Sequence, residues 1–152
     1  MAEAILDIRL AETALDAAGE LAGFMAELPA AGGIVSFTGQ VRGGEGIEAL
    51  ELTQYAPLTL PGMAALGADA AARWPLAGLL IVHRIGELAP GAPIVLVAAA
   101  ARHRRAAFEA ADFVMDHLKS AAWLWKREKA NGVWCWVEPR ADDHADLARW
   151  AR

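Results

Sequence analysis

The sequence predicts an α+β protein in which helices pack against a mixed or antiparallel sheet. Three observations support this class. Segments with apolar residues at helical spacing are interspersed with β-branched, strand-like segments along the 152 residues. The run Pro93–Ala101 is apolar on both faces, as in a central strand. Two alternating aromatic runs flank Asn131-Gly132, a dipeptide typical of the type I′ hairpin turn.

The N-terminal half is expected to hold three strands and two helices. Thr13 and Asp16 resemble a capping box, which satisfies the free N–H groups at a helix start. Pro61 fits the first turn of the second helix, and Pro75 ends it. In chain order, we expect a strand at Ile5–Leu10, a helix with Leu15, Ala18, Leu21, Met25 and Leu28 along one stripe, strands at Gly33–Arg42 and Ile47–Tyr55, and a helix at Pro61–Trp74.

A glycine-rich loop, Gly43–Gly46, separates two of these strands, and we expect the two strands to be antiparallel neighbours. The loop lacks the GxGxxG pattern, so a dinucleotide-binding fingerprint is excluded. Arg42 precedes the loop, where a guanidinium group is well placed to contact a phosphate. An ordinary surface arginine fits the same pattern equally well.

The C-terminal half is expected to hold two strands, a long helix, the hairpin and a short last helix. His83, at a strand end, is interpreted as a structural hydrogen-bonding residue rather than a ligand. These elements are Leu79–Arg84, Pro93–Ala101, the helix Arg104–Lys119, hairpin strands at 123–128 and 133–137, and the helix Asp142–Trp150. The long helix is expected to face the core with Ala107, Phe108, Ala111, Val114, Met115 and Leu118.

Composition predicts one domain, residues 1–152, with a real hydrophobic core. Hydrophobic residues make up 56% of the chain, and the mean hydropathy of +0.27 excludes a disordered chain. The longest apolar runs are about half the length of a membrane span, and no basic segment precedes an apolar one at the N-terminus. We therefore expect a cytoplasmic protein without membrane contact. The acidic pI of about 5.3 argues against nucleic-acid binding.

The single cysteine, Cys135, allows no internal disulfide and no CxxC motif. It lies between Trp134 and Trp136, and we expect a buried structural thiol there. The four scattered histidines offer no metal-ligand spacing, so neither a metal site nor a cofactor is expected.

Positive charge gathers in the window Arg102–Lys129. Its seven bases and four acids give it a net charge of +3, whereas the other residues carry seven bases and fifteen acids, a net −8. All three lysines of the chain, Lys119, Lys126 and Lys129, lie in this window. A local cationic cluster in an acidic protein indicates a small anionic ligand. Solvated surface residues remain the general expectation for lysines.

Lysine, unlike arginine, can lose its proton at a dry site and act as a base, an acid or a nucleophile. Lys126 lies next to Leu124 and Trp125, so burial and neighbouring positive charge are expected to lower its pKa. Such a group suits proton transfer or carbonyl-type chemistry. A pocket for a phosphorylated ring-shaped substrate can be assembled from Arg42, His103, Arg104, Lys119, Lys126 and Arg127.

Several segments agree in order and spacing with one known family. They are SFTGQVR (36–42), RWPL (73–76), VHRIGELAPG (82–91), HRRAAFEAADFVMDHLK (103–119), WKRE (125–128) and WVE (136–138). From about Gly32 to Trp150, the chain resembles the catalytic large subunit of molybdopterin synthase. The resemblance implies an α/β-hammerhead domain with an additional antiparallel sheet.

The resemblance also implies a homodimer that carries two small ubiquitin-like sulfur-carrier subunits, a heterotetramer in all. In that family the C-terminal glycine thiocarboxylate of the carrier donates sulfur. Two transfers convert cyclic pyranopterin monophosphate into the dithiolene of molybdopterin, a step of molybdenum cofactor biosynthesis. By this analogy Lys119 and Lys126 are catalytic, and they also bind substrate together with Gln40, Val41, Arg42, His103, Arg104, Arg127 and Glu128.

The chain departs from the family pattern at two places. Gln40 stands where lysine is common, which removes a charged contact. Ala100-Ala101-Arg102 precedes His103 where a small hydroxyl residue is usual, which removes a hydrogen bond. A chain whose single cysteine is buried also needs an external sulfur donor. Two alternatives stay open: a non-catalytic dimeric module that binds anions or nucleotides, and an inactive paralogue that only binds the carrier.

Overall fold

The computed structural model of the chain describes residues 3–151. Residues 1, 2 and 152, the ends of the predicted domain and the start of the stretch inspected for a secretory signal, lie outside the described residues. The described part forms eight strands and four helices. They are β1 (Ile5–Ala11), α1 (Ala17–Ala26), β2 (Gly33–Gln40), β3 (Ile47–Gln54), α2 (Thr59–Arg73), β4 (Leu76–Arg84), β5 (Gly86–Leu88), β6 (Pro93–Ala101), α3 (Arg104–Lys119), β7 (Leu124–Ala130), β8 (Val133–Val137) and α4 (Ala141–Ala148).

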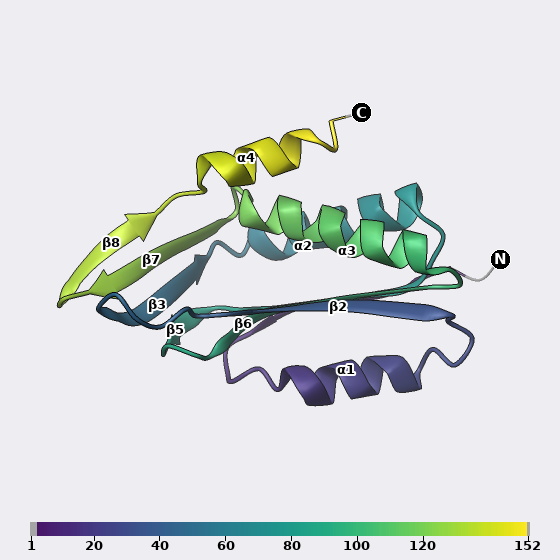
Figure 1. The fold of residues 1–152 in the computed structure, drawn as a ribbon, viewed down its shortest axis with the longest axis horizontal. Coiled ribbons are helices and arrows are strands. Elements are labelled where there is room, and N and C mark those ends of the chain that lie inside the picture. Colours follow the sequence, from purple (N-terminus) through teal and green to yellow (C-terminus); the bar gives the residue numbers. More distant parts are fainter. Residues whose placement is uncertain (1–2, 152) are drawn as a thin grey trace.

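Sheet A has the strand order β1-β4-β6-β2, with β1 parallel to β4 and the other pairs antiparallel. Helices α2 and α3 cover one face and α1 covers the other (Figure 1). Along β4, Leu79 and Ile81 pack toward α2 and α3, whereas Leu80 and Val82 pack toward α1. Both faces of the central strands are therefore buried, which confirms the prediction for Pro93–Ala101.

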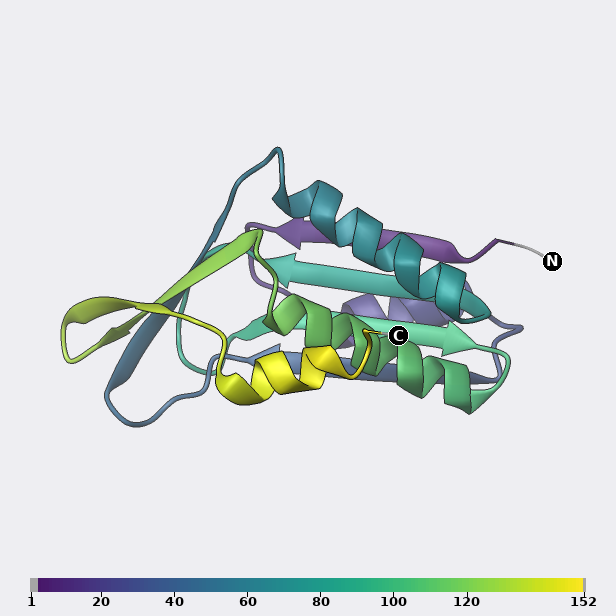
Figure 2. The same cartoon turned by 90° about the horizontal axis from the view of Figure 1, so that it is seen from above.

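Sheet B has the order β5-β3-β7-β8 and projects from one end of the layered body (Figure 2). Its pairs are all antiparallel. The β7–β8 hairpin turns at Asn131 and Gly132, whose φ angles are 51° and 79°. Positive φ at both central positions is the requirement of a type I′ turn. The α+β class, the hairpin and the additional antiparallel sheet are confirmed.

The predicted pairing of the strands that flank Gly43–Gly46 is wrong. β2 pairs with β6 in sheet A, and β3 pairs with β5 and β7 in sheet B. Gly44, Glu45 and Gly46 adopt positive φ angles, and the loop carries the chain from one sheet to the other. Apolar alternation fixes which face of a strand is buried, but it does not fix which strand lies beside it.

Two details of the helices also differ from the predictions. Asp16, and not Thr13, is the N-cap of α1, and its carboxylate accepts a hydrogen bond from the Gly19 N–H at 3.1 Å. The bounds of α3 agree with the prediction, but Phe108 is 55% exposed while Phe113 is fully buried. The predicted stripe is otherwise right, since Ala107, Ala111, Val114 and Leu118 are buried, and Phe113 takes the core position that was expected for Phe108.

Cys135 is exposed, which contradicts the predicted buried thiol. It lies on β8, the edge strand of sheet B, where nothing in the described chain covers its side. Because this only thiol of the chain is exposed, its burial does not support the need for an external sulfur donor. In residues 3–151, no helix has the length and apolar character needed to cross a membrane.

Candidate active site

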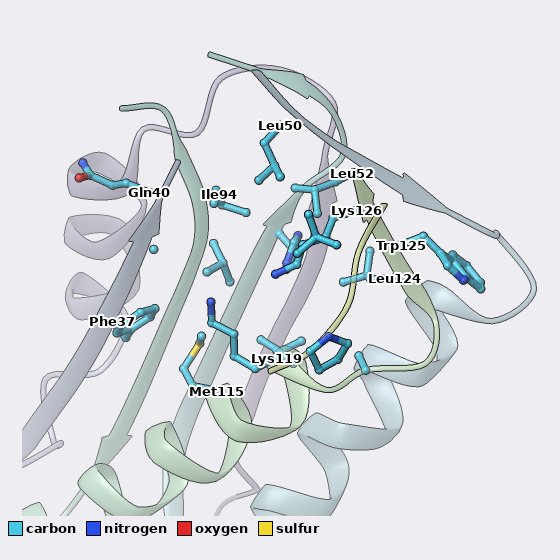
Figure 3. Close-up of a pocket in the computed structure, with 17 residues that line it drawn as sticks. Phe37, Gln40, Leu50, Leu52, Ile94, Met115, Lys119, Leu124, Trp125 and Lys126 are labelled. Carbon is cyan, nitrogen blue, oxygen red and sulfur yellow. The ribbon is translucent and has the colours of Figure 1, made fainter. Parts of the chain in front are cut away.

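Lys119 and Lys126 reach one cavity from two successive elements. Lys119 is the last residue of α3, and Lys126 lies in β7 opposite Leu52 and Val137. Figure 3 shows the two amino groups directed toward the same space. This space, hereafter the lysine cavity, has a volume of about 120 Å³. Lys119 is exposed at its mouth, and Lys126 is half-buried.

The walls of the lysine cavity are mostly apolar because the cavity continues the core between sheet A and α3. Val95 of β6 and Leu118 of α3 belong both to that core and to the cavity wall. Other apolar walls come from Phe37, Leu50, Leu52, Ile94, Met115 and Leu124 (Figure 3). The two ammonium groups thus lie where a core ends and solvent begins.

Burial lowers the pKa of Lys126 below its ordinary value of 10.5, and the positive charge of Lys119 lowers it further. Desolvation disfavours the charged amine, and a second cation nearby disfavours it too. Both causes agree with the prediction from the Leu124-Trp125-Lys126 sequence. A lysine with a lowered pKa exchanges its proton more readily near neutral pH than a solvated lysine does.

A more open groove of about 400 Å³ adjoins the cavity, hereafter the loop groove. Gln40, Lys119 and Lys126 line both spaces. The loop that joins the two sheets brings Val41 and Arg42 to the groove, and β7 brings Glu128. These are six of the nine predicted site residues. One chain therefore gathers Gln40, Val41, Arg42, Lys119, Lys126 and Glu128 around one continuous surface.

His103 and Arg104 lie at the other end of α3. Arg104 is the first residue of this 16-residue helix and Lys119 is the last, so they are about 22 Å apart at 1.5 Å per residue. His103 lines a different pocket, beside Leu28 and Leu76. A single chain does not bring this pair of residues to the two lysines.

Arg127 faces away from the lysine cavity. Its Nε donates a hydrogen bond to Glu51 at 2.7 Å, and its guanidinium lies 4.5 Å from the ring centre of Trp134. Side chains alternate along a strand, so Lys126 and Glu128 share one face of β7 and Arg127 takes the other. The structure does not place Arg127 with the other predicted substrate-binding residues.

A clamp formed by α2 holds the short connection between the two lysines. Thr59 is fully buried, and its hydroxyl donates a hydrogen bond to the Trp123 carbonyl while accepting one from the Tyr55 N–H at 2.9 Å. The Trp123 indole lies against Gly62, where an added Cβ would approach its nitrogen to 2.5 Å. Because Trp123 follows Lys119 by four residues and precedes Lys126 by three, the clamp fixes how the lysines are spaced.

Two charged residues at the start of α4 also line the loop groove, and no sequence pattern predicted their position. Trp150 packs edge-on against Phe113, with ring centres 5.5 Å apart, and its Nε1 donates to Asp116 at 2.6 Å. This packing fixes α4 along α3, as Figure 2 shows, and brings Arg140 and Asp143 to the loop groove. The spacing of these charges along the chain gives no sign of their position, because tertiary packing alone sets it.

His83 lines the lysine cavity although the sequence indicated only a structural role. The hydrogen bond is present, since Nδ1 lies 2.8 Å from the Arg84 carbonyl oxygen. Burial lowers the pKa of His83 to about 4, and the positive charges of Lys126 and Lys119 contribute to this shift. Side chains alternate along β4, so His83 lies on the same face as Leu79 and Ile81, which pack against α3. This alternation could have predicted that His83 faces the cavity.

An apolar cavity with two lysines, open to a groove with Arg42, can bind a small anion that also carries an uncharged ring. Within residues 3–151, no three His, Cys, Asp or Glu side chains are grouped closely enough to hold a metal ion. Fold and cavity together define an α+β protein whose apolar cavity is lined by two lysines.

Comparison with known proteins gives the family. Residues 10–121 match the family model described as MoaE protein, and the chain belongs to the MoaE family. It is 42% identical over 146 residues to the molybdopterin synthase catalytic subunit of Pseudomonas aeruginosa, an alignment that covers 94% of this chain and 97% of that one.

Two solved structures are similar to the whole fold. The molybdopterin biosynthesis MoaE protein from Burkholderia ambifaria MC40-6 has a TM-score of 0.82 and 38% identity, covering 97% of this chain and 99% of that one. A complex of subunits 1 and 2 of the molybdopterin-converting factor from Helicobacter pylori 26695 has a TM-score of 0.75, covering 90% and 92% of the two chains. At 22% identity, the second likeness shows a shared fold alone.

The charge of Lys119 can be tested as a cause of the pKa shift of Lys126. We expect Lys119→Gln to raise the pKa of Lys126 toward 10.5, because a nearby cation is removed. With only three lysines in the chain, a ¹³C NMR titration of the lysine side chains resolves each one. Lys129→Gln is the control, since Lys129 pairs with Glu48 at 3.8 Å and is no cause of the shift. An unchanged Lys126 pKa in Lys119→Gln would contradict the assignment.

The clamp can be tested with two substitutions of Thr59. Thr59→Val keeps the shape but leaves the Trp123 carbonyl and the Tyr55 N–H without their partner, which costs about 1–3 kcal/mol of unfolding free energy. For a domain of this size, we expect a melting temperature lower by roughly 2–10 °C. Thr59→Ser keeps the hydroxyl and should lie closer to the wild type. Equal melting temperatures for the wild type and Thr59→Val, measured by calorimetry, would show that the hydrogen bonds contribute little.

Proposed function

We propose that this chain is the catalytic subunit of a molybdopterin synthase and transfers sulfur from a thiocarboxylated carrier to cyclic pyranopterin monophosphate. The observation that carries the proposal is the joint presence of Lys119 and Lys126 in one apolar-walled cavity of a MoaE-family chain. The P. aeruginosa relative is named for this catalytic role. The cytoplasmic setting remains a prediction from the sequence.

The overall exchange is balanced without an oxidant or a reductant. In each transfer, one sulfur of a carrier thiocarboxylate forms a bond to a substrate carbon, and one oxygen leaves that carbon. Water then cleaves the bond between that sulfur and the acyl carbon, so the carrier leaves as a carboxylate whose new oxygen comes from the water. Two such exchanges supply the two sulfurs of the dithiolene.

The two lysines suit different parts of this exchange. Lys126, with its lowered pKa, is positioned to give a proton to the leaving oxygen and to take one from an attacking water. Lys119, exposed at the cavity mouth, is positioned to stabilise the negative charge that develops on the acyl oxygen. Arg42 in the loop groove supplies a guanidinium group for the substrate phosphate.

The carrier must bring its terminal glycine into the same cavity. Glycine has no side chain, so a tail that ends in it can enter a narrow space such as the lysine cavity, whose volume is about 120 Å³. The H. pylori structure of the same fold is a complex of two subunits. A small carrier subunit is therefore the partner that we infer for this chain.

Substitution of each lysine tests the catalytic assignment. Lys119→Ala and Lys126→Ala should each lose about 10²–10⁴ in rate, because each removes a proton-transfer or charge-stabilising group. The measurement is molybdopterin formation from thiocarboxylated carrier and cyclic pyranopterin monophosphate, with melting temperatures compared alongside. Wild-type turnover in either alanine variant would reject the assignment.

Arginine substitutions separate catalysis from simple charge neutralisation. A non-catalytic anion-binding module needs only positive charge, so Lys119→Arg and Lys126→Arg should bind ligand nearly as the wild type does. An enzyme should lose most turnover in the same variants while ligand binding, measured by calorimetry, remains. Any product formed by the wild-type protein would also exclude the alternative of an inactive paralogue that retains only carrier binding.

A twofold dimer with shared sites explains the distance between the ends of α3. In this arrangement Lys119 and Lys126 of one subunit meet His103 and Arg104 of the other at one substrate. The alternative, that the helix starts later and the loop before it folds back, does not hold, because α3 begins at Arg104. The 16-residue length of α3 supports the shared site, because a small pterin cannot span about 22 Å.

Subunit mixing tests the shared site. Arg104→Ala and Lys119→Ala are each expected to be inactive as homodimers. After exchange at a one-to-one ratio, half of the dimers are mixed, and each mixed dimer holds one intact and one doubly altered site. About a quarter of wild-type activity should return. If mass spectrometry confirms mixed dimers and no activity returns, the shared site is ruled out.

A further inference from the structure

His83 is a buried polar residue in the lysine cavity that the proposed chemistry does not use. It follows Ile81 on the α3 face of β4, and its register partner on β6 is Val95, another residue of the cavity wall. Only 7% of its surface is exposed. It therefore lies on the inner wall of the cavity, deeper than Lys119.

The backbone contact of His83 fixes its tautomer. A carbonyl oxygen only accepts hydrogen bonds, so Nδ1 must carry the hydrogen that it donates to the Arg84 carbonyl at 2.8 Å. In the neutral ring, Nε2 is then an acceptor. Burial and the two nearby lysines hold the pKa of His83 at about 4, so the ring stays neutral at physiological pH.

Nε2 remains available to a ligand. Among the described residues, Nε2 makes no hydrogen bond. The only fully buried side-chain polar atom without a partner in residues 3–151 is Ser120 Oγ, so Nε2 is not fully buried. The small exposed area of His83 therefore includes Nε2 or lies beside it, at the cavity.

Hydrogen-bond acceptors are scarce around this cavity. Its lining has no carboxylate side chain, lysine ammonium groups only donate, and the Met115 thioether is a weak acceptor. Gln40 offers an amide oxygen, but it is exposed and its amide extends away from the lysines in Figure 3. His83 Nε2 is thus the one buried strong side-chain acceptor in the lining of the lysine cavity.

We propose that His83 Nε2 accepts a hydrogen bond from an N–H or O–H group of the bound substrate and thereby selects ligands that carry a donor at the inner wall. This inference rests on the proposed function, because it assumes that the pterin phosphate occupies the cavity. Arg42 in the loop groove then binds the phosphate, and the neutral histidine accepts a hydrogen bond from the ring. A ligand without the donor leaves Nε2 buried and unpaired, which weakens binding.

Two substitutions separate the two nitrogen atoms of His83. In His83→Asn, the short amide can still donate to the Arg84 carbonyl, but nothing stands at the position of Nε2. In His83→Gln, the longer side chain places its amide oxygen near that position. We expect His83→Asn to bind cyclic pyranopterin monophosphate about 10- to 100-fold more weakly by calorimetry and His83→Gln to recover most of the loss. In turnover assays KM should rise more than kcat falls.

The comparison remains decisive if His83→Asn does not fold. His83→Met is close to His83→Gln in size but lacks a strong acceptor, so the Met variant should bind weakly and the Gln variant well. The inference would be overturned if His83→Asn, or both His83→Met and His83→Gln, bound the substrate with wild-type affinity. The proposed function would stand in that case, provided that the wild-type protein is active. A wild-type chain that neither binds nor converts the substrate would overturn both.

Discussion

The packing of α3 on sheet A is the constraint on which the site depends. Val114 and Leu118 are buried against β6, so the last turn of α3 has a fixed height above the sheet. Lys119 follows directly at the point where the apolar layer ends. The Thr59 clamp then holds Trp123, and β7 enters sheet B with Lys126 turned back toward α3. Two lysines that are seven positions apart thus meet because a helix end and a strand start are both held by the core.

The division of polarity within the cavity follows from the same layering. Groups that keep their charge, such as Arg42, lie at the rim and in the loop groove, where water still solvates them. His83 lies among apolar neighbours, where a charged ring would lose its solvation, and so it is neutral. Lys126 lies between these limits. A gradient from charged rim to neutral wall suits a ligand with an anionic end and a polar, uncharged ring.

Residue patterns predicted the elements well and their neighbours poorly. The bounds of α3 and the Asn131-Gly132 turn depend on local sequence, so they could be predicted. The lowered pKa of Lys126 depends on burial in the fold, and it could be predicted because Leu124 and Trp125 indicated that burial. The partner of β3 depends on contacts with β7, more than seventy residues later, which alternation cannot encode. The exposure of Cys135 could not be predicted for the same reason: the sequence of an aromatic strand does not show whether another element covers both of its faces.

The partial burial of Lys126 also has a consequence for stability. Its pKa is lower in the folded chain than the unfolded value of 10.5, so between these two values the unfolded chain binds more protons. The free energy of unfolding therefore rises with pH across that window. Below the folded pKa the whole penalty is present, and above 10.5 it vanishes. At neutral pH, burial of the protonated lysine lowers the free energy of unfolding, and the apolar contacts of β4, β6 and α3 offset this loss. The same burial lets Lys126 release its proton more readily.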